Sequence, residues 1–327
     1  MNKTSRLFQE ISREKLEEIT EYYLNCPLED GKLLSGGLFN TTYLLRTGKG
    51  EAILRLGPVN RRLLLEYERN LMEAETDVLS LLHKHGIPTS RILAVDTRRT
   101  IVDRDVMLLQ RIPARSMSLM EPDKETEERL CRETGTLVRR IHEITADELP
   151  KTSEKPYGRY GAVLAGQGGA TWREALEEEV RGWQRCMGRT DLLPEENVER
   201  IAECFFSRSP VLDIPQLRPR LVHGDLWYGN ILVDDRGCLT AVIDVDRALF
   251  GDPEFDLASG WMTTSAFFAG YGKKPDLDSA ACLRRRLYKL LLDMEDCYVL
   301  YEEYASPQEA HRLAAQVMED VKTLESL

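Results

Sequence analysis

The sequence has no long apolar run and no closely paired cysteines. Its longest notable uncharged stretch, residues 257–272, is rich in Gly, Ser and Thr, and it is too short and too polar to cross a bilayer. The first 11 residues mix charges with no apolar run, so neither a secretory signal nor a membrane anchor is expected. Seven cysteines are scattered singly with no Cys-x-x-Cys pair, which favours reduced thiols in a cytoplasm over a zinc site or a disulfide framework.

Basic residues are outnumbered by acidic ones, 44 to 55. The formal net charge is −11, which argues against DNA or RNA as a partner because nucleic-acid affinity rests on basic patches. The acidic excess is confined to one part of the chain, with 17 basic and 16 acidic residues up to Pro113 but 27 and 39 after it. Such a surface aids solubility, and it can also concentrate a cationic substrate around a C-terminal site.

What the chain does have, 42% apolar residues over 327 positions, is enough for one large domain or two lobes. An amphipathic helix is predicted near the start, followed by three short strands in an antiparallel meander with glycine-rich turns. A helix with apolar residues at helical spacing and two more strands complete this part. In order, these elements are predicted over 12–24, 32–35, 41–47, 51–56, 71–82, 91–96 and 106–110.

After Pro113 the pattern is mostly helical. Helices are predicted over 125–144, 172–187, 195–207, 254–268, 277–304 and 307–327. One extended hairpin, within 221–245, interrupts them. The sequence therefore predicts an α+β fold of two lobes, with a small antiparallel-sheet N-lobe over residues 1–113 and a larger helical C-lobe over residues 114–327.

The strongest motif is HGDLWYGN at residues 223–230, followed by Asp244 at the end of a hairpin strand. Apolar strands flank these polar residues, so Asp225, Asn230 and Asp244 can converge on one point. Phosphoryl transfer needs one carboxylate to accept the proton of the attacking hydroxyl, and hard oxygen ligands to hold Mg²⁺ against the phosphates. We assign Asp225 as the base, and Asn230 and Asp244 as the metal ligands. His-Gly-Asp alone is a common tripeptide, and it is the flanking strands that favour the functional interpretation.

The stretch HGDLWYGNILVDDRGCLTAVIDVDRALFGDPEFDLA resembles the catalytic core of the aminoglycoside phosphotransferase and choline kinase-like superfamily. The resemblance extends upstream and covers most of residues 33–258. It implies a bilobal protein-kinase-like fold that moves the γ-phosphate of ATP, with Mg²⁺, onto a hydroxyl of a small molecule. Choline, fructosamine, homoserine and aminoglycoside kinases share versions of these motifs, so the acceptor stays undefined.

Two upstream segments resemble the nucleotide-binding parts of this superfamily. Ser35, Gly36, Gly37 and Asn40 lie between the first two strands, where backbone N–H groups can approach phosphate oxygens. Glycines before an asparagine are also an ordinary turn signal. The classical P-loop spacing is absent from the sequence. Residues 107–113 resemble the linker between lobes, where the backbone of Gln110 to Ile112 would meet the adenine edge.

Arg55 occupies the strand position at which protein kinases carry a phosphate-gripping lysine. A cation among apolar neighbours needs an anionic partner, and Glu75 on the following helix is the predicted one, with Glu73 as the alternative. Arginine also stands there in choline-kinase-like members. Because arginine and lysine differ in geometry, this departure puts the nucleotide affinity in question more than the chemistry.

The other polar residues near the motif have structural interpretations. Asp252 is expected to cap a helix, and its acidic segment through Asp256 to steady the catalytic loop, as in relatives. Asp246 is expected to be a solvated strand end, with metal ligation as the alternative. His223 and His142 are expected to be hydrogen-bonded core residues.

The acceptor site is the least defined part. Acidic residues cluster in the penultimate helix, where a solvated face is the commoner explanation, and three aromatic residues are candidates for a pocket wall. The acidic residues are Asp293, Glu295, Asp296, Glu302 and Glu303, and the aromatic ones are Tyr157, Tyr160 and Trp172. A small, cationic or polyhydroxylated acceptor is favoured on charge alone. A catalytically silent nucleotide-binding scaffold is the alternative function.

Overall fold

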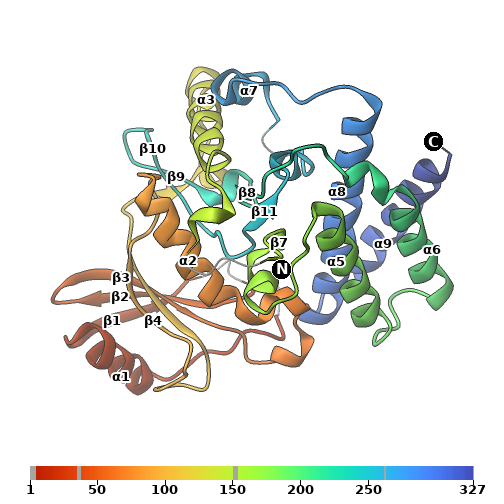
Figure 1. Ribbon diagram of the computed structural model, residues 1–327. Helices are drawn as coiled ribbons and strands as arrows, with labels where there is room; N and C mark the ends of the chain where they lie inside the picture. The colour runs from red at the N-terminus through yellow and green to blue at the C-terminus, as the bar shows by residue number, and fades with distance from the viewer. Residues whose placement is uncertain (1–4, 35–37, 150–153, 261–262, 327) are drawn as a thin grey trace.

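The computed structural model describes residues 5–34, 38–149, 154–260 and 263–326. The N-terminal part is built on a five-stranded antiparallel sheet with the strand order β1-β2-β3-β5-β4 (Figure 1). Its elements are α1 (Arg13–Leu24), β1 (Leu28–Leu33), β2 (Thr41–Thr47), β3 (Gly50–Leu56), α2 (Leu71–Lys84), β4 (Ile92–Asp96) and β5 (Val106–Gln110).

Local sequence signals explain these elements. Ser12 caps α1 by accepting a hydrogen bond from the backbone N–H of Lys15. In β2, buried and more exposed residues alternate, as expected for a strand with one face on a core. The apolar stripe of α2, which includes Met72, Val78 and Leu82, packs into a core with Met107 of β5. The helix therefore lies against the sheet and carries Glu75 into the interior.

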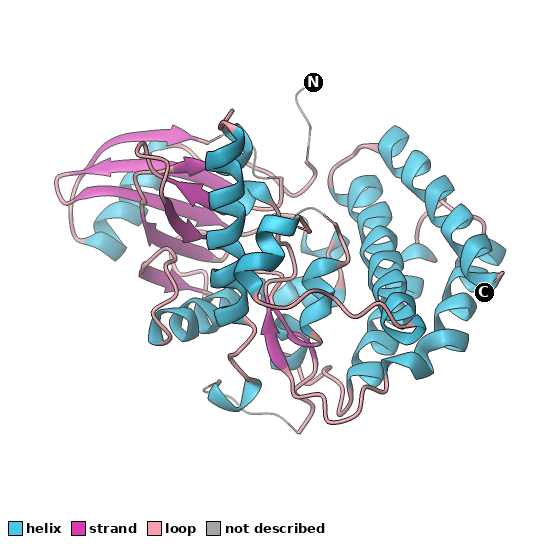
Figure 2. Ribbon diagram, turned by 90° about the horizontal axis from the view of Figure 1, so that it is seen from above, coloured by secondary structure: helices cyan, strands magenta, loops and turns pink. Residues whose placement is uncertain are grey.

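The rest of the chain is mainly helical. Its helices are α3 (Lys124–Ile141), α4 (Tyr160–Leu164), α5 (Trp172–Met187), α6 (Glu195–Arg208), α7 (Ser265–Tyr271), α8 (Ser279–Tyr298) and α9 (Pro307–Glu325). Its strands are β6 (Arg115–Ser116), β7 (Gly158–Arg159), β8 (Arg220–Val222), β9 (Ile231–Val233), β10 (Leu239–Val242) and β11 (Leu249–Gly251). Figure 2 shows α5, α6, α8 and α9 gathered on the side away from the five-stranded sheet.

The HGDLWYGN motif links two small sheets, since it runs from the end of β8 to the start of β9. One has the order β10-β9-β6 and the other β7-β11-β8. Their apolar residues, including Ile231 and Val242, share a core with α2 and α3, and the backbone N–H of Val242 donates to the carbonyl of Pro88 at 3.0 Å. The predicted α+β plan of a small sheet followed by a helical part is therefore confirmed. Because this core continues across residue 113, the boundary between lobes at that position stays a prediction.

Three details of the predicted elements are wrong. The first strand lies at Leu28–Leu33, earlier than predicted, because its pairing with β2 extends from Leu28. The single helix predicted over 254–268 is a 3-10 turn (Pro253–Leu257) followed by α7. Gly260, with a φ of 76°, lies between the two, and a left-handed residue cannot continue a right-handed helix. The two-residue strands β6 and β7 were not predicted, because so short a run has no periodicity.

Within the described residues, no helix combines the length and the apolar character needed to cross a membrane.

Candidate active site

The loop that carries Asp225, the predicted catalytic loop, follows β8 and is held by a buried aspartate. Asp256 accepts hydrogen bonds from the backbone N–H groups of His223, at 2.9 Å, and Gly224, at 2.8 Å. The Nε2 atom of His142 lies 2.9 Å from the same carboxylate. This confirms the expected steadying role of Asp256 and the hydrogen-bonded core positions of both histidines. Asp252 caps the following 3-10 turn as predicted.

A glycine is required just before Asp225, the predicted base. Gly224 has a φ of 79°, and a Cβ atom added there would lie 2.2 Å from the carbonyl oxygen of Arg247. Real Cβ atoms do not approach a backbone that closely. The loop carrying Asp225 is therefore pressed directly against the segment that follows Asp244.

Substituting Asp256 should destabilise the protein strongly. Burial raises the pKa of Asp256, but hydrogen bonding and charge from His142 and the loop more than reverse this, and the net pKa is lowered. Its contribution to stability is therefore present above the unfolded-state pKa and is lost as pH falls through the lower folded-state value. We expect Asp256→Asn to cost about 3–5 kcal/mol at pH 7, measured by urea unfolding. The difference from wild type should shrink in acid, and equal stability at pH 7 would contradict the role. Asp235→Asn, at an exposed hairpin position, is the control.

Asn230 joins the two parts of the motif. Its Nδ2 donates to the backbone carbonyl of Asp225 at 2.8 Å and to the Oδ2 of that residue at 2.9 Å. Its own carbonyl accepts from the N–H of Ile243 at 3.0 Å, next to Asp244. Because the amide donors face Asp225, the Oδ1 of Asn230 is the atom left to meet a cation. The structure thus brings together the three residues that the sequence singled out.

Arg55 reaches this cluster from the N-terminal sheet. Its Nη1 forms an ion pair with the Oε1 of Glu75, the predicted partner. Its Nη2 lies 2.9 Å from the Oδ1 of Asp244 and 3.1 Å from the Oδ2 of Asp246. The Asp244 side chain is 42% exposed and its φ is 63°, a left-handed conformation that is uncommon for a residue other than glycine. Backbone conformations of this kind are often found at functional sites.

The prediction that Asp246 is a solvated strand end is wrong. Its side chain is 13% exposed and pairs with Arg55, because the chain turns inward after Asp244. Burial and the neighbouring Asp244 hold the pKa of Asp246 well above its usual value, and Arg55 offsets this only in part. Burial likewise raises the pKa of Glu75, against the opposing effect of Arg55. One guanidinium thus faces three carboxylates, an excess of negative charge that a divalent cation would offset.

Of the residues predicted to contact the nucleotide, the structure describes some and leaves others out. Ser35, Gly36 and Gly37 lie outside the described residues. Asn40 is buried and lines a small cavity together with Glu75 and Asp246, so it lies close to the ion-pair cluster.

At the predicted linker, some backbone groups already form hydrogen bonds within the protein. The N–H of Gln110 donates to the carbonyl of Arg91 at 2.8 Å, and the carbonyl of Ile112 accepts from Ala114 at 2.8 Å. The N–H of Arg111 donates to the carbonyl of Glu51 at 3.4 Å, and the contact of residues 110–112 with an adenine edge stays a prediction.

The sequence predicted that the acidic residues of the penultimate helix form a solvated face. For two of them this prediction is wrong. Glu295 and Glu303 are buried, with 1% and 0% exposure, and burial holds the pKa of each well above its usual value. Asp296 differs, since its side chain is 52% exposed. Partial desolvation by the surrounding protein and the nearby carboxylates of Glu295 and Asp225, against the opposing effect of Arg247, raise the pKa of Asp296 to about 6. The sequence treated these residues alike, although the exposed Asp296 directly follows the buried Glu295 and Glu303 lies beyond the end of α8.

The aromatic candidates for a pocket wall also divide. Tyr160 and Trp172 are core residues with 0% and 2% exposure. Tyr160 donates to Asp77 and Trp172 to Tyr288, so their polar atoms are satisfied inside the protein. Tyr157 is the exception, since it lines a pocket beside α5.

Known phosphotransferases resemble this chain in sequence. A family model described as the phosphotransferase enzyme family matches residues 30–282. The hygromycin-B 4-O-kinase of Escherichia coli is 29% identical over 47% of this chain and 45% of its own length. The aminoglycoside 3'-phosphotransferase of Streptomyces fradiae is 26% identical over 57% of this chain and 62% of its own length. The chain thus matches about half of the length of these curated relatives.

Solved structures resemble the whole chain. A putative fructosamine-3-kinase from Haemophilus somnus has a TM-score of 0.63 at 15% identity, with 93% of this chain and 97% of that one covered. A thermostable mutant of aminoglycoside phosphotransferase APH(4)-Ia, in a ternary complex with AMP-PNP and hygromycin B, has a TM-score of 0.63 at 16% identity, with 94% and 98% covered. These likenesses show a bilobal kinase-like fold. The chain belongs to the phosphotransferase enzyme family, whose model matches most of its length.

Proposed function

We propose that this protein is an ATP-dependent phosphotransferase that moves the γ-phosphate onto a hydroxyl of a small molecule. The observation that carries the proposal is the hydrogen-bonded unit of Asp225, Asn230 and the strand end at Asp244, with Arg55 reaching it from the sheet. A general base, two metal ligands and a phosphate-facing cation at one point are the parts that phosphoryl transfer needs. Relatives named as hygromycin-B and ketoamine kinases support the same chemistry.

In this proposal each side chain has one task. Asp225 orients the acceptor hydroxyl and takes its proton, and the two bonds from Asn230 hold the carboxylate in place. Arg55 contacts phosphate oxygens when nucleotide enters, while Glu75 keeps its guanidinium aimed at the site. The backbone near Asn40, together with Gln110 and Ile112, holds the nucleotide. Positioning and charge stabilisation supply most of the rate.

Mg²⁺ fits the donor set. The described residues contain no group of three or more His, Cys, Asp or Glu side chains that could form a complete metal cage. Mg²⁺ seldom uses such cages, since it is usually held by one or two protein oxygens, waters and substrate phosphates. Asn230 and Asp244 would hold it, and it would neutralise charge on the phosphates. The surplus of carboxylates around Arg55 favours a cation of this charge.

For the acceptor, the electrostatics favour a positively charged group. The half-exposed carboxylate of Asp296 lies close enough to Asp225 for their charges to interact, so an ammonium group on the acceptor would be attracted beside the base.

The free state of all seven cysteines supports a reducing compartment such as the cytoplasm.

A silent nucleotide-binding scaffold is the weaker alternative. Its one argument is that arginine replaces lysine at position 55, but Arg55 retains both the glutamate partner and the contact with Asp244. No described feature of the site opposes catalysis.

A screen of acceptors with purified protein and Mg-ATP tests the proposal. We expect ADP release above the water-only rate with at least one compound among aminoglycosides, amino alcohols and sugar amines. Neutral polyols of the same size provide the matched control for charge. Nucleotide binding without turnover on any hydroxyl compound would favour the scaffold instead.

A further inference from the structure

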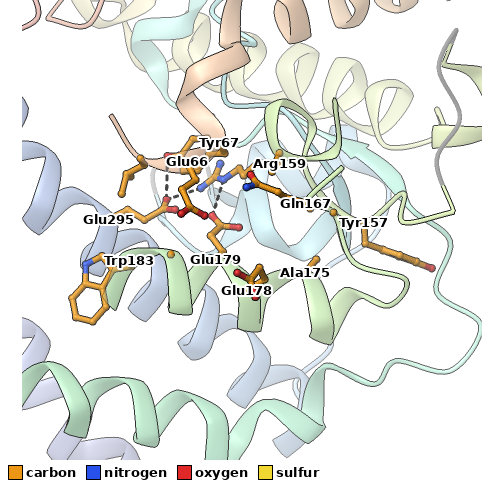
Figure 3. A pocket seen from close by; sticks show the side chains of 15 residues that line it. Glu66, Tyr67, Tyr157, Arg159, Gln167, Ala175, Glu178, Glu179, Trp183 and Glu295 are labelled. Atoms are coloured by element: carbon orange, nitrogen blue, oxygen red, sulfur yellow. Dashed lines mark hydrogen bonds and ion pairs between the residues drawn. The ribbon is translucent and has the colours of Figure 1, made fainter. Parts of the chain in front are cut away.

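A second arginine lies buried beneath the catalytic loop. Arg159 ends β7, where it pairs with Leu249 of β11, and its side chain is 1% exposed. Its Nε donates to the Oε1 of Glu179 at 2.9 Å, and its Nη2 donates to the Oε2 of Glu295 at 2.8 Å. Figure 3 shows the guanidinium between these carboxylates, which come from α5 and α8. Two helices of the C-terminal part therefore fix one end of this group.

Aromatic rings complete the enclosure. The guanidinium carbon lies 5.0 Å from the ring centroid of Tyr67 and 5.2 Å from that of Phe255, distances at which a cation is attracted to a ring. Arg159 also lines a pocket with a volume of about 490 Å³, counting the part open to solvent. Glu178, Glu179 and Tyr157 line the same pocket.

The other end of the group touches the proposed active site. The Nη1 of Arg159 donates to the backbone carbonyl of Arg247 at 3.0 Å, three residues after Asp244. The same nitrogen would lie 3.0 Å from a Cβ atom placed on Gly224, the residue before Asp225. One planar group therefore contacts the loop that carries the base and the segment that carries a metal ligand, although it reaches neither carboxylate.

We propose that Arg159 is a positioning residue, which sets the spacing between the catalytic loop at Asp225 and the metal-binding segment at Asp244. This inference rests on the proposed function. The guanidinium presents donors in fixed directions within one plane, so its bonds to Glu179 and Glu295 determine where the carbonyl of Arg247 is held. Because the pressed contact at Gly224 leaves no free space, a shift of that carbonyl moves the loop as well.

A merely structural role makes a different prediction. Buried ion networks contribute little net stability, and replacing a whole set by neutral groups of similar volume is often harmless. If Arg159 served only to balance Glu179 and Glu295, a neutral replacement of all three side chains would leave turnover intact. If the bond from its Nη1 to the carbonyl of Arg247 positions the two segments, kcat stays low even in a neutral triple variant that folds stably.

Arg159→Lys is the first test, because it keeps the charge and loses the fork of donors. We expect kcat to fall about 10- to 100-fold, the range for small misplacements of catalytic groups, with little change in binding of a non-hydrolysable ATP analogue. Turnover is measured with the acceptor found by the screen and, independently, as ATP hydrolysis by water. Arg173→Lys is the matched control, because Arg173 is partly exposed and pairs with Asp213 at 3.2 Å; its kcat should not change.

The second test separates folding from positioning. The triple variant Arg159→Met, Glu179→Gln, Glu295→Gln should unfold near the wild-type urea midpoint and keep the low kcat. Wild-type kcat in the triple variant or in Arg159→Lys would overturn the inference, as would a loss confined to nucleotide binding. A wild-type chain that turns over in neither assay contradicts the proposed function instead.

Discussion

Asp225→Asn should lower kcat by about a hundredfold to ten-thousandfold, the usual cost of losing a general base. The amide has nearly the same shape as the carboxylate, and its oxygen can still accept the hydrogen bond that Asn230 donates at 2.9 Å. The loop also keeps its anchor at Asp256. The variant therefore removes the proton acceptor and leaves the architecture.

The assay is ADP release with the acceptor from the screen, alongside thermal unfolding and titration with an ATP analogue. The unfolding temperature and the affinity for the ATP analogue should match those of wild type, because Asp225 has no proposed part in holding nucleotide. Asp235→Asn makes the same chemical change at an exposed position of the neighbouring hairpin and should leave kcat unaltered. Near-normal turnover in Asp225→Asn would remove this residue from the base role.

The second large effect is expected for Asp244→Ala, which should abolish the stabilisation of the protein by Mg-ATP against heat. A ligand that binds only the folded state stabilises it by an amount set by its concentration over its dissociation constant, about 2.7 kcal/mol at a hundredfold excess. Without Asp244 the metal keeps only Asn230 among the proposed protein ligands, and the phosphates lose their link to the C-terminal part. The measurement is the unfolding temperature with and without Mg-ATP.

Asp244 also pairs with Arg55, so the variant frees one donor of a buried guanidinium. Glu75 and Asp246 still hold that group, and the apo protein should therefore fold. ATP with EDTA in place of Mg²⁺ separates the metal from the nucleotide, because wild type under EDTA should resemble the variant. Full protection of Asp244→Ala by Mg-ATP would contradict the metal assignment.

Much of the site was predictable, because its parts are local in sequence. The catalytic loop is eight residues long, and Asp244 follows on the paired strand, since Val242 of β10 lies opposite Ile231 of β9. A hairpin has a register that short-range turn signals define. Glu75 was the preferred partner of Arg55, with Glu73 as the alternative, because the spacing of apolar residues indicated a buried face on α2, and the structure shows the pair with Glu75.

What could not be predicted depends on distant parts of the chain. Asp246 was expected in solvent, yet the chain turns inward after the left-handed Asp244, and no sequence signal marks that turn. The role of Arg159 could not be predicted, because its partners Glu179 and Glu295 are 20 and 136 residues away. An ion network of this kind forms only after β7, α5 and α8 have packed together, so composition and periodicity cannot predict it.

The most direct test of the account is the position of a manganese ion in crystals grown with Mn²⁺ and a non-hydrolysable ATP analogue, located by its anomalous scattering. We expect a peak within coordination distance of the Oδ1 of Asn230 and a carboxylate oxygen of Asp244, beside the nucleotide phosphates and facing Asp225. A peak bound to other residues, or a nucleotide seated away from this cluster, would contradict the assignment of the site.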